Sequence, residues 1–239
     1  FVPMSSLMPI TLGVARASNT GNPQLSTAHR VLTPDARQGI FDRDNHTCAC
    51  CGFRSTRYMD VLHKDRNIKN NDPANLVTVC QFCAQCFDLD SVVNMKSGFL
   101  IWMPEIDQAT LNHIARAVYI ARVSQGPMAD AARRLLDIIM TRREDVKRRL
   151  HTDDPFVLAS VMRDFLPAKL YADRAKKLDG VRLFPLDRRM VKEGDLEFNQ
   201  FPQILAFWRS KDGPFGGKLP AQWLEYFKDM RSEERRVGK

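Results

Sequence analysis

Apolar residues follow two different spacings along this chain, and the change comes near residue 104. Before it, short apolar segments at 57–63 and 98–104 are bounded by turn-forming residues, which is typical of strands. After it, apolar residues recur every three or four positions, as on one face of a helix. Asp107 can cap the first of these helices. Its predicted inward positions are Leu111, Ile114, Ala115, Val118 and Ala121.

Two longer helices are predicted next. Gly126 and Pro127 interrupt the pattern, and a helix is predicted over 128–150. An Asp-Asp-Pro sequence at 153–155 starts another helix, which extends to about residue 165. The inward positions predicted for these two helices are Ala131, Leu135, Ile138, Ile139, Val146 and Leu150, followed by Leu158, Val161, Met162 and Phe165.

The remaining C-terminal pattern is shorter and more varied. We expect a fourth helix over 168–178 and an extended segment over 181–186. Two short aromatic-rich helices follow at 201–209 and 220–230, separated by the Gly-rich loop 212–218. Most of the aromatic side chains are expected in the core, although each is also a candidate partner anchor: Phe87, Phe99, Trp102, Phe201, Phe207, Trp208, Trp223 and Phe227.

The N-terminal part carries fewer signals. Residues 8–15 could form one strand. Thr33 followed by Pro34 resembles a helix N-cap with proline at the first helical position, and this helix is predicted to run to about Asp44. Together these patterns predict an α+β fold, in which a ββα module that carries the cysteines precedes a mostly helical region.

The predicted domain boundaries follow these changes in pattern. They are an N-terminal extension at 1–31, a cysteine-bearing module at 32–104, a helical region at 105–209, and a Gly-rich loop with a short aromatic helix at 210–230. Residues 231–239 resemble the in-frame translation of a sequencing-adapter oligonucleotide and are set aside. The chain begins with Phe1, and we expect the natural start at Met4 or Met8.

Composition excludes several classes of protein. Hydrophobic residues make up 44% and charged residues 27% of the 239 positions, which is ordinary for a folded domain. The longest apolar runs are far shorter than the roughly 18 residues of a membrane helix, so no membrane insertion is predicted. A formal net charge of +8 is a mild bias, so nucleic acid is not a predicted partner.

The six cysteines are clustered. All of them fall within 48–86, whereas a secreted disulfide scaffold would distribute them along the chain. Clustering without a signal sequence favours metal binding in a reducing compartment. The six are Cys48, Cys50, Cys51, Cys80, Cys83 and Cys86.

Two C-x2-C pairs supply the four thiolates that one Zn²⁺ ion requires, and we predict a site of Cys48, Cys51, Cys80 and Cys83. Gly52 can adopt the positive φ that closes a metal-binding turn, which favours Cys51 over Cys50. Cys86 has the same spacing from Cys83, so its replacement of one ligand stays open. Four thiolates leave no position for water, which predicts one structural zinc and not a catalytic one.

The order of motifs around these cysteines resembles the HNH endonuclease module. The matching residues are Arg43-Asp44, Cys48, Cys51-Gly52, Asp60, Asn75-Leu76, Cys80 and Cys83. The resemblance implies a treble-clef-like ββα zinc module. However, the two catalytic histidine positions hold Val61 and Ala84, and neither can accept a proton or bind a metal. His63 lies two residues further along the strand, a displacement of roughly 6.6 Å. We therefore predict no enzymatic activity.

A longer resemblance runs from about Leu32 to Arg209 and includes the stretch NNDPANLVTVCQFCAQCF. The segments GFLIWMPEIDQATLN, DDPFVLASVMRDF and GVRLFPLDRR are also similar to the DotN (IcmJ) family of the Dot/Icm type IVB secretion system. That resemblance implies a zinc-containing adaptor that binds the C-terminal region of the coupling ATPase, alongside other coupling-complex and effector-adaptor subunits. It also implies a cytoplasmic location at the inner membrane.

The sequence leaves two alternatives open. One is a metal-dependent HNH-like nuclease that uses His63, and the other is a zinc-organised DNA-binding protein. Basic residues recur along 128–150, where they form either a solvated face or a docking surface for an acidic segment or nucleic acid. They are Arg133, Arg134, Arg142, Arg143, Lys147, Arg148 and Arg149.

Overall fold

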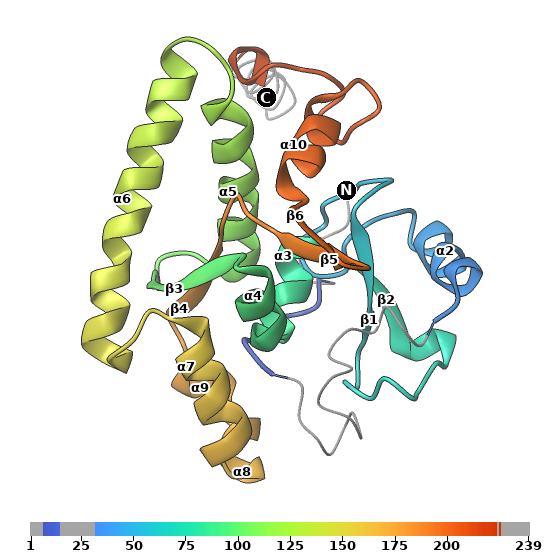
Figure 1. Cartoon of the computed structure of the whole chain (residues 1–239), viewed down its shortest axis with the longest axis vertical. Coiled ribbons are helices and arrows are strands. Elements are labelled where there is room, and N and C mark those ends of the chain that lie inside the picture. The colour runs from blue at the N-terminus through green and yellow to red at the C-terminus, as the bar shows by residue number, and fades with distance from the viewer. Residues whose placement is uncertain (1–6, 15–31, 224, 226–239) are drawn as a thin grey trace, which may run out of the picture.

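The computed structural model describes residues 7–14, 32–223 and 225, and its architecture is α+β as predicted (Figure 1). Two long antiparallel helices form one side of the molecule, and a hairpin with a short helix forms the other. Within the described part, strands pair into two-stranded antiparallel sheets. These are β1 (Met59–His63) with β2 (Leu76–Cys80), β3 (Gly98–Trp102) with β4 (Val181–Pro185), and β5 (Met190–Glu193) with β6 (Leu196–Asn199).

Helix α2 (Pro34–Arg43) begins where the sequence predicts it. The Thr33 hydroxyl accepts a hydrogen bond from the Ala36 amide at 3.2 Å, and the helix ends one residue before Asp44. Its buried Ile40 packs against Val61 of β1 and Leu76 of β2. The helix therefore covers one face of the β1–β2 hairpin, whose register pairs Val61 with Thr78.

Short helical turns follow β2 and lead into the second sheet. They are α3 (Gln81–Ala84), η4 (Gln85–Phe87) and α4 (Leu89–Met95), and a further turn, η3 (Pro73–Asn75), precedes β2. Lys96 ends α4 in the left-handed region, with φ of 52°. The hairpin, the turns and α4 give the ββα order expected of the cysteine-bearing region.

The predicted N-terminal strand is wrong within the described residues 8–14. These residues form no strand, and their backbone hydrogen bonds go to turns. The Met8 amide donates to the Ala49 carbonyl at 2.8 Å, and the Gly13 amide donates to the Cys86 carbonyl at 3.0 Å. The segment is thus held along the cysteine region without forming a ladder. The rest of the 1–31 extension lies outside the described residues.

The β3–β4 pair joins segments about eighty residues apart in the chain. Leu100 pairs with Leu183, and both are fully buried. Gly180, with φ of +83°, immediately precedes β4, and a Cβ there would lie 2.5 Å from the Trp102 ring. Only glycine allows this close approach, which sets where β4 begins.

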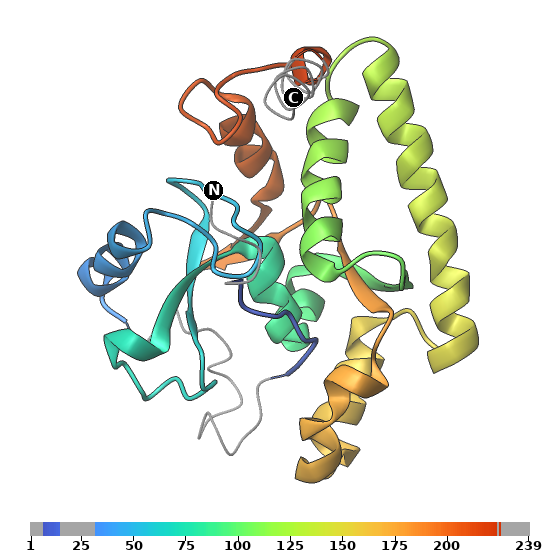
Figure 2. The ribbon, with the colours of Figure 1, turned by 180° about the vertical axis from the view of Figure 1, so that it is seen from behind.

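Helix α5 (Gln108–Arg122) has the predicted cap and the predicted core face. The Asp107 carboxylate accepts from the Thr110 amide at 2.7 Å. The side chains of Leu111, Ala115, Val118 and Ala121 are buried, and Ile114 is partly buried. Both Figure 1 and Figure 2 show α5 between the long outer helix α6 and the cysteine region.

Helix α6 (Pro127–Leu150) forms as predicted, but half of its inward face is assigned wrongly. Ala131 and Leu135 are exposed, and 60% of Ile138 is exposed. The helix contacts α5 and β3 along a narrow stripe, because it lies on the outside of the molecule and no further layer covers its flanks. The buried positions in the stripe are Ala129, Ala132, Ile139 and Val146.

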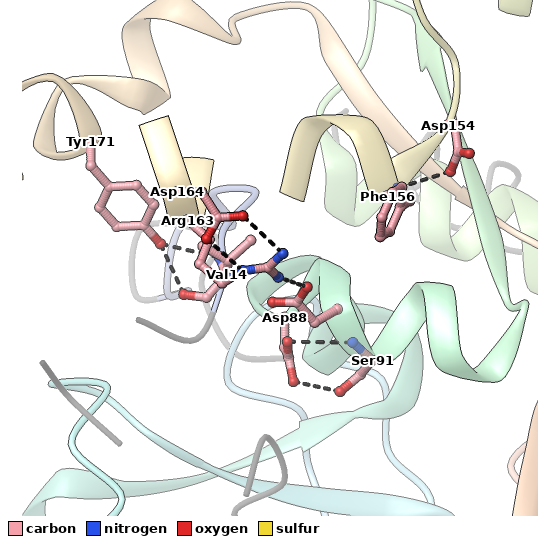
Figure 3. Close-up of polar contacts among 9 residues, drawn as sticks. Val14, Asp88, Ser91, Asp154, Phe156, Arg163, Asp164 and Tyr171 are labelled. Atoms are coloured by element: carbon pink, nitrogen blue, oxygen red, sulfur yellow. Dashed lines mark hydrogen bonds and ion pairs between the residues drawn. The ribbon is translucent and has the colours of Figure 1, made fainter. Parts of the chain in front are cut away.

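Beyond α6 the chain forms a projection of short helices. They are α7 (Pro155–Ser160), the π-helix η5 (Val161–Phe165), α8 (Ala168–Ala172) and α9 (Arg174–Lys177). The single helix predicted over 168–178 is therefore wrong, since Asp173 interrupts it. Asp154 caps α7 by accepting from the Phe156 amide at 2.8 Å (Figure 3). Met162 is buried as predicted, whereas Val161 and Phe165 are exposed.

Helix α10 (Phe201–Arg209) confirms its prediction and packs on the cysteine side of α5 through Phe201 and Trp208. The β5–β6 hairpin before it was not predicted. Pro220–Trp223 and Glu225 are helical, and the rest of the helix predicted over 220–230 lies outside the described residues, as do Phe227 and residues 231–239. Of the other aromatic candidates, Phe87, Phe99, Phe201 and Trp208 are buried, and Trp102, Phe207 and Trp223 are partly buried.

Candidate metal centre

The fold brings the four predicted ligands together. The Sγ atoms of Cys48, Cys51, Cys80 and Cys83 all lie within 4.8 Å of one another, and all four residues are buried. Cys51 and Cys80 approach to 3.7 Å between sulfurs. Two thiolates at tetrahedral corners with Zn–S bonds of about 2.3 Å are separated by ~3.8 Å, so this spacing fits a tetrahedral ion.

Local backbone geometry explains how the first pair converges. Gly52 has φ of 71°, as predicted, and its amide donates to the Cys48 carbonyl at 2.9 Å. The Cys48 amide in turn donates to the Phe53 carbonyl at 2.9 Å. Both bonds close a tight turn, which aims the two sulfurs at one point. The second pair is presented by the last residue of β2 and by α3.

The two spare cysteines lie outside this group. Cys86 is buried and its Sγ donates to the Phe82 carbonyl at 3.2 Å. Cys50 is also buried, yet it is not among the four converging sulfurs. Cys86 therefore packs as a small core residue, whereas Cys50 lies beside the group, in side-chain contact with Cys48 and Cys83.

A second layer of polar groups reaches the sulfurs from α5. The Asn112 amide nitrogen donates to Cys83 Sγ at 3.3 Å, and Arg116 Nη2 donates to Cys80 Sγ at 2.6 Å. The Arg116 guanidinium also lies over the ring of Phe53, 4.1 Å from its centroid, and only 1% of the residue is exposed. The sequence pattern did not predict this layer. Its signal is the four-residue spacing of Gln108, Asn112 and Arg116 on one face of an otherwise apolar helix.

His113 completes the connection between α5 and the first metal-binding turn. Its Nε2 donates to the Cys51 carbonyl at 2.8 Å, and its Nδ1 lies 3.4 Å from Arg116 Nη1, which can donate to it. The hydrogen bond with Cys51 raises the pKa of His113 above its ordinary value. Helix α5 is therefore attached to both halves of the cysteine site through polar contacts.

The pKa values of the cysteine thiols differ from one another. Contact with Cys48 raises the pKa of Cys51, but hydrogen bonds with Cys80 and Cys83 outweigh it and lower that pKa to about 5. The pKa of Cys83 is raised, first of all by its contact with Cys48. Burial raises the pKa of Cys86 well above its ordinary value, because no charged partner compensates the loss of water. Within the converging group, the pKa is thus lowered for Cys48, Cys51 and Cys80 and raised for Cys83.

The positions that correspond to nuclease residues have other roles here. Val61 is buried against α2. The Asp60 carboxylate accepts from Arg37 Nη2 at 3.1 Å and from the Val61 amide at 2.8 Å. His63 is only 2% exposed, and its Nε2 lies 3.0 Å from Asn71 Oδ1. Ala84 is partly buried beside the cysteine site.

Comparison with known proteins identifies the relatives of this chain. No protein-family model matches it. It is 32% identical over 160 residues to the type 4 apparatus protein DotN of Legionella pneumophila, and the match covers 65% of this chain and 74% of that protein. The chain belongs to the DotN family. The resemblance seen in the sequence is thereby confirmed for DotN, while the likeness to HNH nucleases stays an interpretation.

Two further findings bear on what this DotN family member contacts. None of the helices that the structure describes combines the length and the apolarity that a bilayer crossing requires. The basic residues along α6 are largely paired within the chain. Arg142 contacts Glu105 at 2.7 Å, Lys147 contacts Glu144 at 2.9 Å, and ion pairs join Arg143 to Asp153 and Arg148 to Asp145. This pairing favours a solvated, mixed-charge face over a nucleic-acid surface.

Proposed function

We propose that this chain is a non-catalytic, zinc-stabilised adaptor subunit of a type IVB secretion coupling complex. In this role it binds the C-terminal segment of the coupling ATPase, together with other coupling-complex and effector-adaptor subunits, at the cytoplasmic face of the inner membrane. The observation that carries the proposal is the identity with DotN, which extends over 74% of a relative named as a type 4 apparatus protein.

The zinc assignment is supported by the chemistry of the ligand set. Four buried cysteines on two short turns match the preference of Zn²⁺ for thiolates in a closed tetrahedral shell. The spacing of 3.7 Å between two of the sulfurs is compatible with that geometry. A closed shell of this kind contributes to folding and does not activate water.

The absence of catalysis is supported by the surroundings of Asp60 and His63. In a nuclease reading, Asp60 would help to bind a divalent cation, but here its carboxylate already pairs with the Arg37 guanidinium. His63 is buried and hydrogen-bonded to Asn71, so an attacking water molecule would not reach it without rearrangement of the chain. A general base requires such access.

The partner surface that we propose lies on the projection of short helices. We define the α7–α8 apolar surface as Phe156, Val157, Val161, Phe165 and Leu170, each of which is more than two-fifths exposed. Phe165 is 78% exposed. The five residues lie close together in sequence on consecutive helices, and exposed apolar patches are a feature of protein-binding surfaces. A bound segment would remove these side chains from water.

Co-expression with the C-terminal segment of the coupling ATPase from the same gene neighbourhood tests the proposal. We expect a stable 1:1 complex that contains one zinc per chain. Phe165→Asp should abolish the complex, because it places a charge in the proposed contact. The matched control is Leu196→Asp on the β5–β6 hairpin, where the leucine is 64% exposed and far from the projection in sequence, and it should bind normally.

Two results would contradict the proposal. One is a zinc-loaded chain that does not bind the ATPase segment. The other is plasmid nicking that requires Mg²⁺ and disappears in His63→Ala, which would restore the nuclease alternative. Binding of duplex DNA with a steep salt dependence would instead support the DNA-binding alternative.

A further inference from the structure

Arg116 is a buried cation without a carboxylate partner. Within the described residues, no Asp or Glu forms an ion pair with it, and 1% of the residue is exposed. Its guanidinium lies between the rings of Phe53 and Phe82, with distances of 4.1 and 5.2 Å to the ring centroids. The anionic groups that it can contact are therefore the sulfurs of Cys80 and Cys51, at 2.6 and 3.8 Å from Nη2.

Because this charge is buried, it needs a nearby anion, and the cysteine sulfurs are the groups that can supply one. A buried guanidinium is destabilising unless an anion offsets its charge, and a neutral thiol is only a weak acceptor. Four thiolates around a divalent ion carry a net charge of −2 together with the ion. A buried arginine beside them compensates part of that excess, and in return the thiolates compensate the arginine.

We propose that Arg116 is the counter-cation of the metal–thiolate centre, so that packing of helix α5 depends on metal binding. This inference rests on the zinc site of the proposed function and adds a role that zinc ligation alone does not assign. Arg116 acts as a positioning residue, since it contacts the ligand sulfurs and not the ion.

Because Arg116 lies on α5, metal loss should affect more of the chain than the cysteine turns. Helix α5 packs against α6, β4 and α10, and it lies between the cysteine region and the outer helix (Figure 2). Removal of the ion frees the ligand sulfurs to move away from Arg116, whose charge then lies unpaired between Phe53 and Phe82. Release of α5 then relieves the unpaired charge. Metal loss is therefore expected to loosen the helical region as well as the cysteine turns.

The test compares zinc affinity and metal-linked stability in Arg116→Met and Arg116→Lys. Zinc affinity of the full chain is measured by competition with a chromophoric chelator under reducing conditions, and the Tm is measured with and without zinc. We expect Arg116→Met to bind zinc about 10- to 100-fold more weakly, which is the usual effect of removing a contact to a metal ligand. Arg116→Lys keeps the charge but loses the planar guanidinium, and should fall between Met and the unmodified chain.

A matched control lies on the same helix. Arg122 contacts an aromatic ring, Tyr119, at 5.2 Å and pairs with Asp187, but it does not contact a cysteine. Arg122→Met should therefore leave zinc affinity unchanged. Co²⁺ substitution supplies an independent readout, because the visible spectrum of Co²⁺ in a four-thiolate tetrahedron should persist in Arg116→Met if only the counter-charge has been removed.

The outcomes separate this inference from the zinc site itself. If the unmodified chain binds no metal, both the zinc site and the role of Arg116 are wrong. If the chain binds zinc and Arg116→Met retains full affinity with the same Tm change on metal removal, only the role of Arg116 is wrong. Equal weakening in Met and Lys would assign the effect to packing instead of charge and would also overturn the proposal. Hydrogen exchange along α5 that increases on metal removal supports it.

Discussion

The cysteine region and the α7–α9 projection are stabilised in opposite ways. Around the cysteines, the buried polar side chains of Asn112 and Arg116 on α5 contact the cysteine sulfurs. In the projection, large apolar side chains face solvent, and polar contacts of Arg163 with Asp90 and of Tyr171 with Val14 attach it to the rest of the chain (Figure 3). Helices of four to six residues are unstable in isolation, so the projection depends on this attachment.

This difference indicates a division between stability and recognition. Buried ligands with polar support define one conformation and give a large penalty when any member is removed. Exposed apolar side chains contribute little to folding, but they gain free energy when a partner covers them. Substitutions in the cysteine region should therefore affect folding first, whereas substitutions on the α7–α8 apolar surface should affect binding first.

The largest expected effect comes from losing one ligand. Cys83→Ser should lose zinc and soluble folding, because structural zinc sites supply on the order of 10 kcal/mol in small zinc domains, comparable with the whole stability of a typical domain. Zinc content and the soluble fraction on expression measure this outcome. The same result is expected for Cys48→Ser, Cys51→Ser and Cys80→Ser.

Cys86→Ser is the matched control for that series. The residue is buried nearby, and its sulfur donates to the Phe82 carbonyl, a bond that serine can keep. Its expected loss of stability is about 1 kcal/mol, with zinc retained. Cys50→Ser should be similarly mild. If Cys86→Ser removes the metal while Cys80→Ser does not, the assignment of ligands is wrong.

The next effect tests whether the polar face of α5 supports the second sheet as well as the cysteines. Gln108 Nε2 donates to the Leu183 carbonyl at 2.8 Å, and its Oε1 accepts from the Leu183 amide at 2.9 Å. Its side chain thus satisfies both backbone groups of a buried strand residue. Gln108→Leu leaves them unpaired and should reduce the free energy of unfolding by roughly 2–4 kcal/mol. Urea denaturation measures it, with exposed Gln38→Leu expected to change stability by less than about 0.5 kcal/mol.

The sequence predicted local features of the fold better than long-range ones. Caps at Thr33 and Asp107 are local chemistry, and both were predicted correctly. The inward face of α6 was wrong at Leu135 and Ile138, because periodicity identifies an apolar face but not how much of it a neighbour covers. Pairing of β3 with β4 and the β5–β6 hairpin were not predicted, since no local pattern specifies which strands meet.

The candidate site shows the same limit. Spacing of the C-x2-C pairs and the position of Gly52 were enough to select the four cysteines that converge. Asn112 and Arg116 were missed, because polar residues within an apolar helical pattern are ordinarily expected to face water. Their contact with the sulfurs depends on how α5 crosses the cysteine region, which is a property of tertiary packing.

A pH-dependent prediction concerns Asp88, which caps α4, the helix against which α7 of the projection packs (Figure 3). Burial raises the pKa of Asp88 from 3.8 to about 6, although hydrogen bonds from Ser91 oppose the change. Because the folded-state pKa exceeds the unfolded one, this group favours folding most at low pH. That contribution is lost as the pH rises from about 4 to about 6.

Asp88→Asn removes this pH dependence while it keeps an acceptor for the Ser91 amide. The variant should be more stable than the unmodified chain by about 1–2 kcal/mol at pH 7.5, and the difference should disappear below pH 4. Urea denaturation at several pH values measures it.

Asp107→Asn is the contrasting control. The Thr110 amide lowers the pKa of Asp107, so its stabilising effect is present above the unfolded pKa and is lost as the pH falls. If both variants change stability in the same direction with pH, burial does not set the pKa of Asp88.

The smallest effect concerns the ion pair that ties the projection to α4. Arg163 of η5 contacts Asp90 and lies 3.1 Å from Asp164, with about a third of its side chain exposed (Figure 3). Partly exposed pairs of this kind contribute up to about 1 kcal/mol, so Arg163→Gln should reduce global stability by no more than that. Its local effect should be larger, since Asp90 and Arg163 join separate elements, and hydrogen exchange in α7 should increase while exchange in α5 does not. Arg148→Gln, which removes an exposed pair within a single helix, should change neither. Faster exchange throughout α5 in Arg163→Gln would show that the two regions unfold together and would remove the contrast drawn between them.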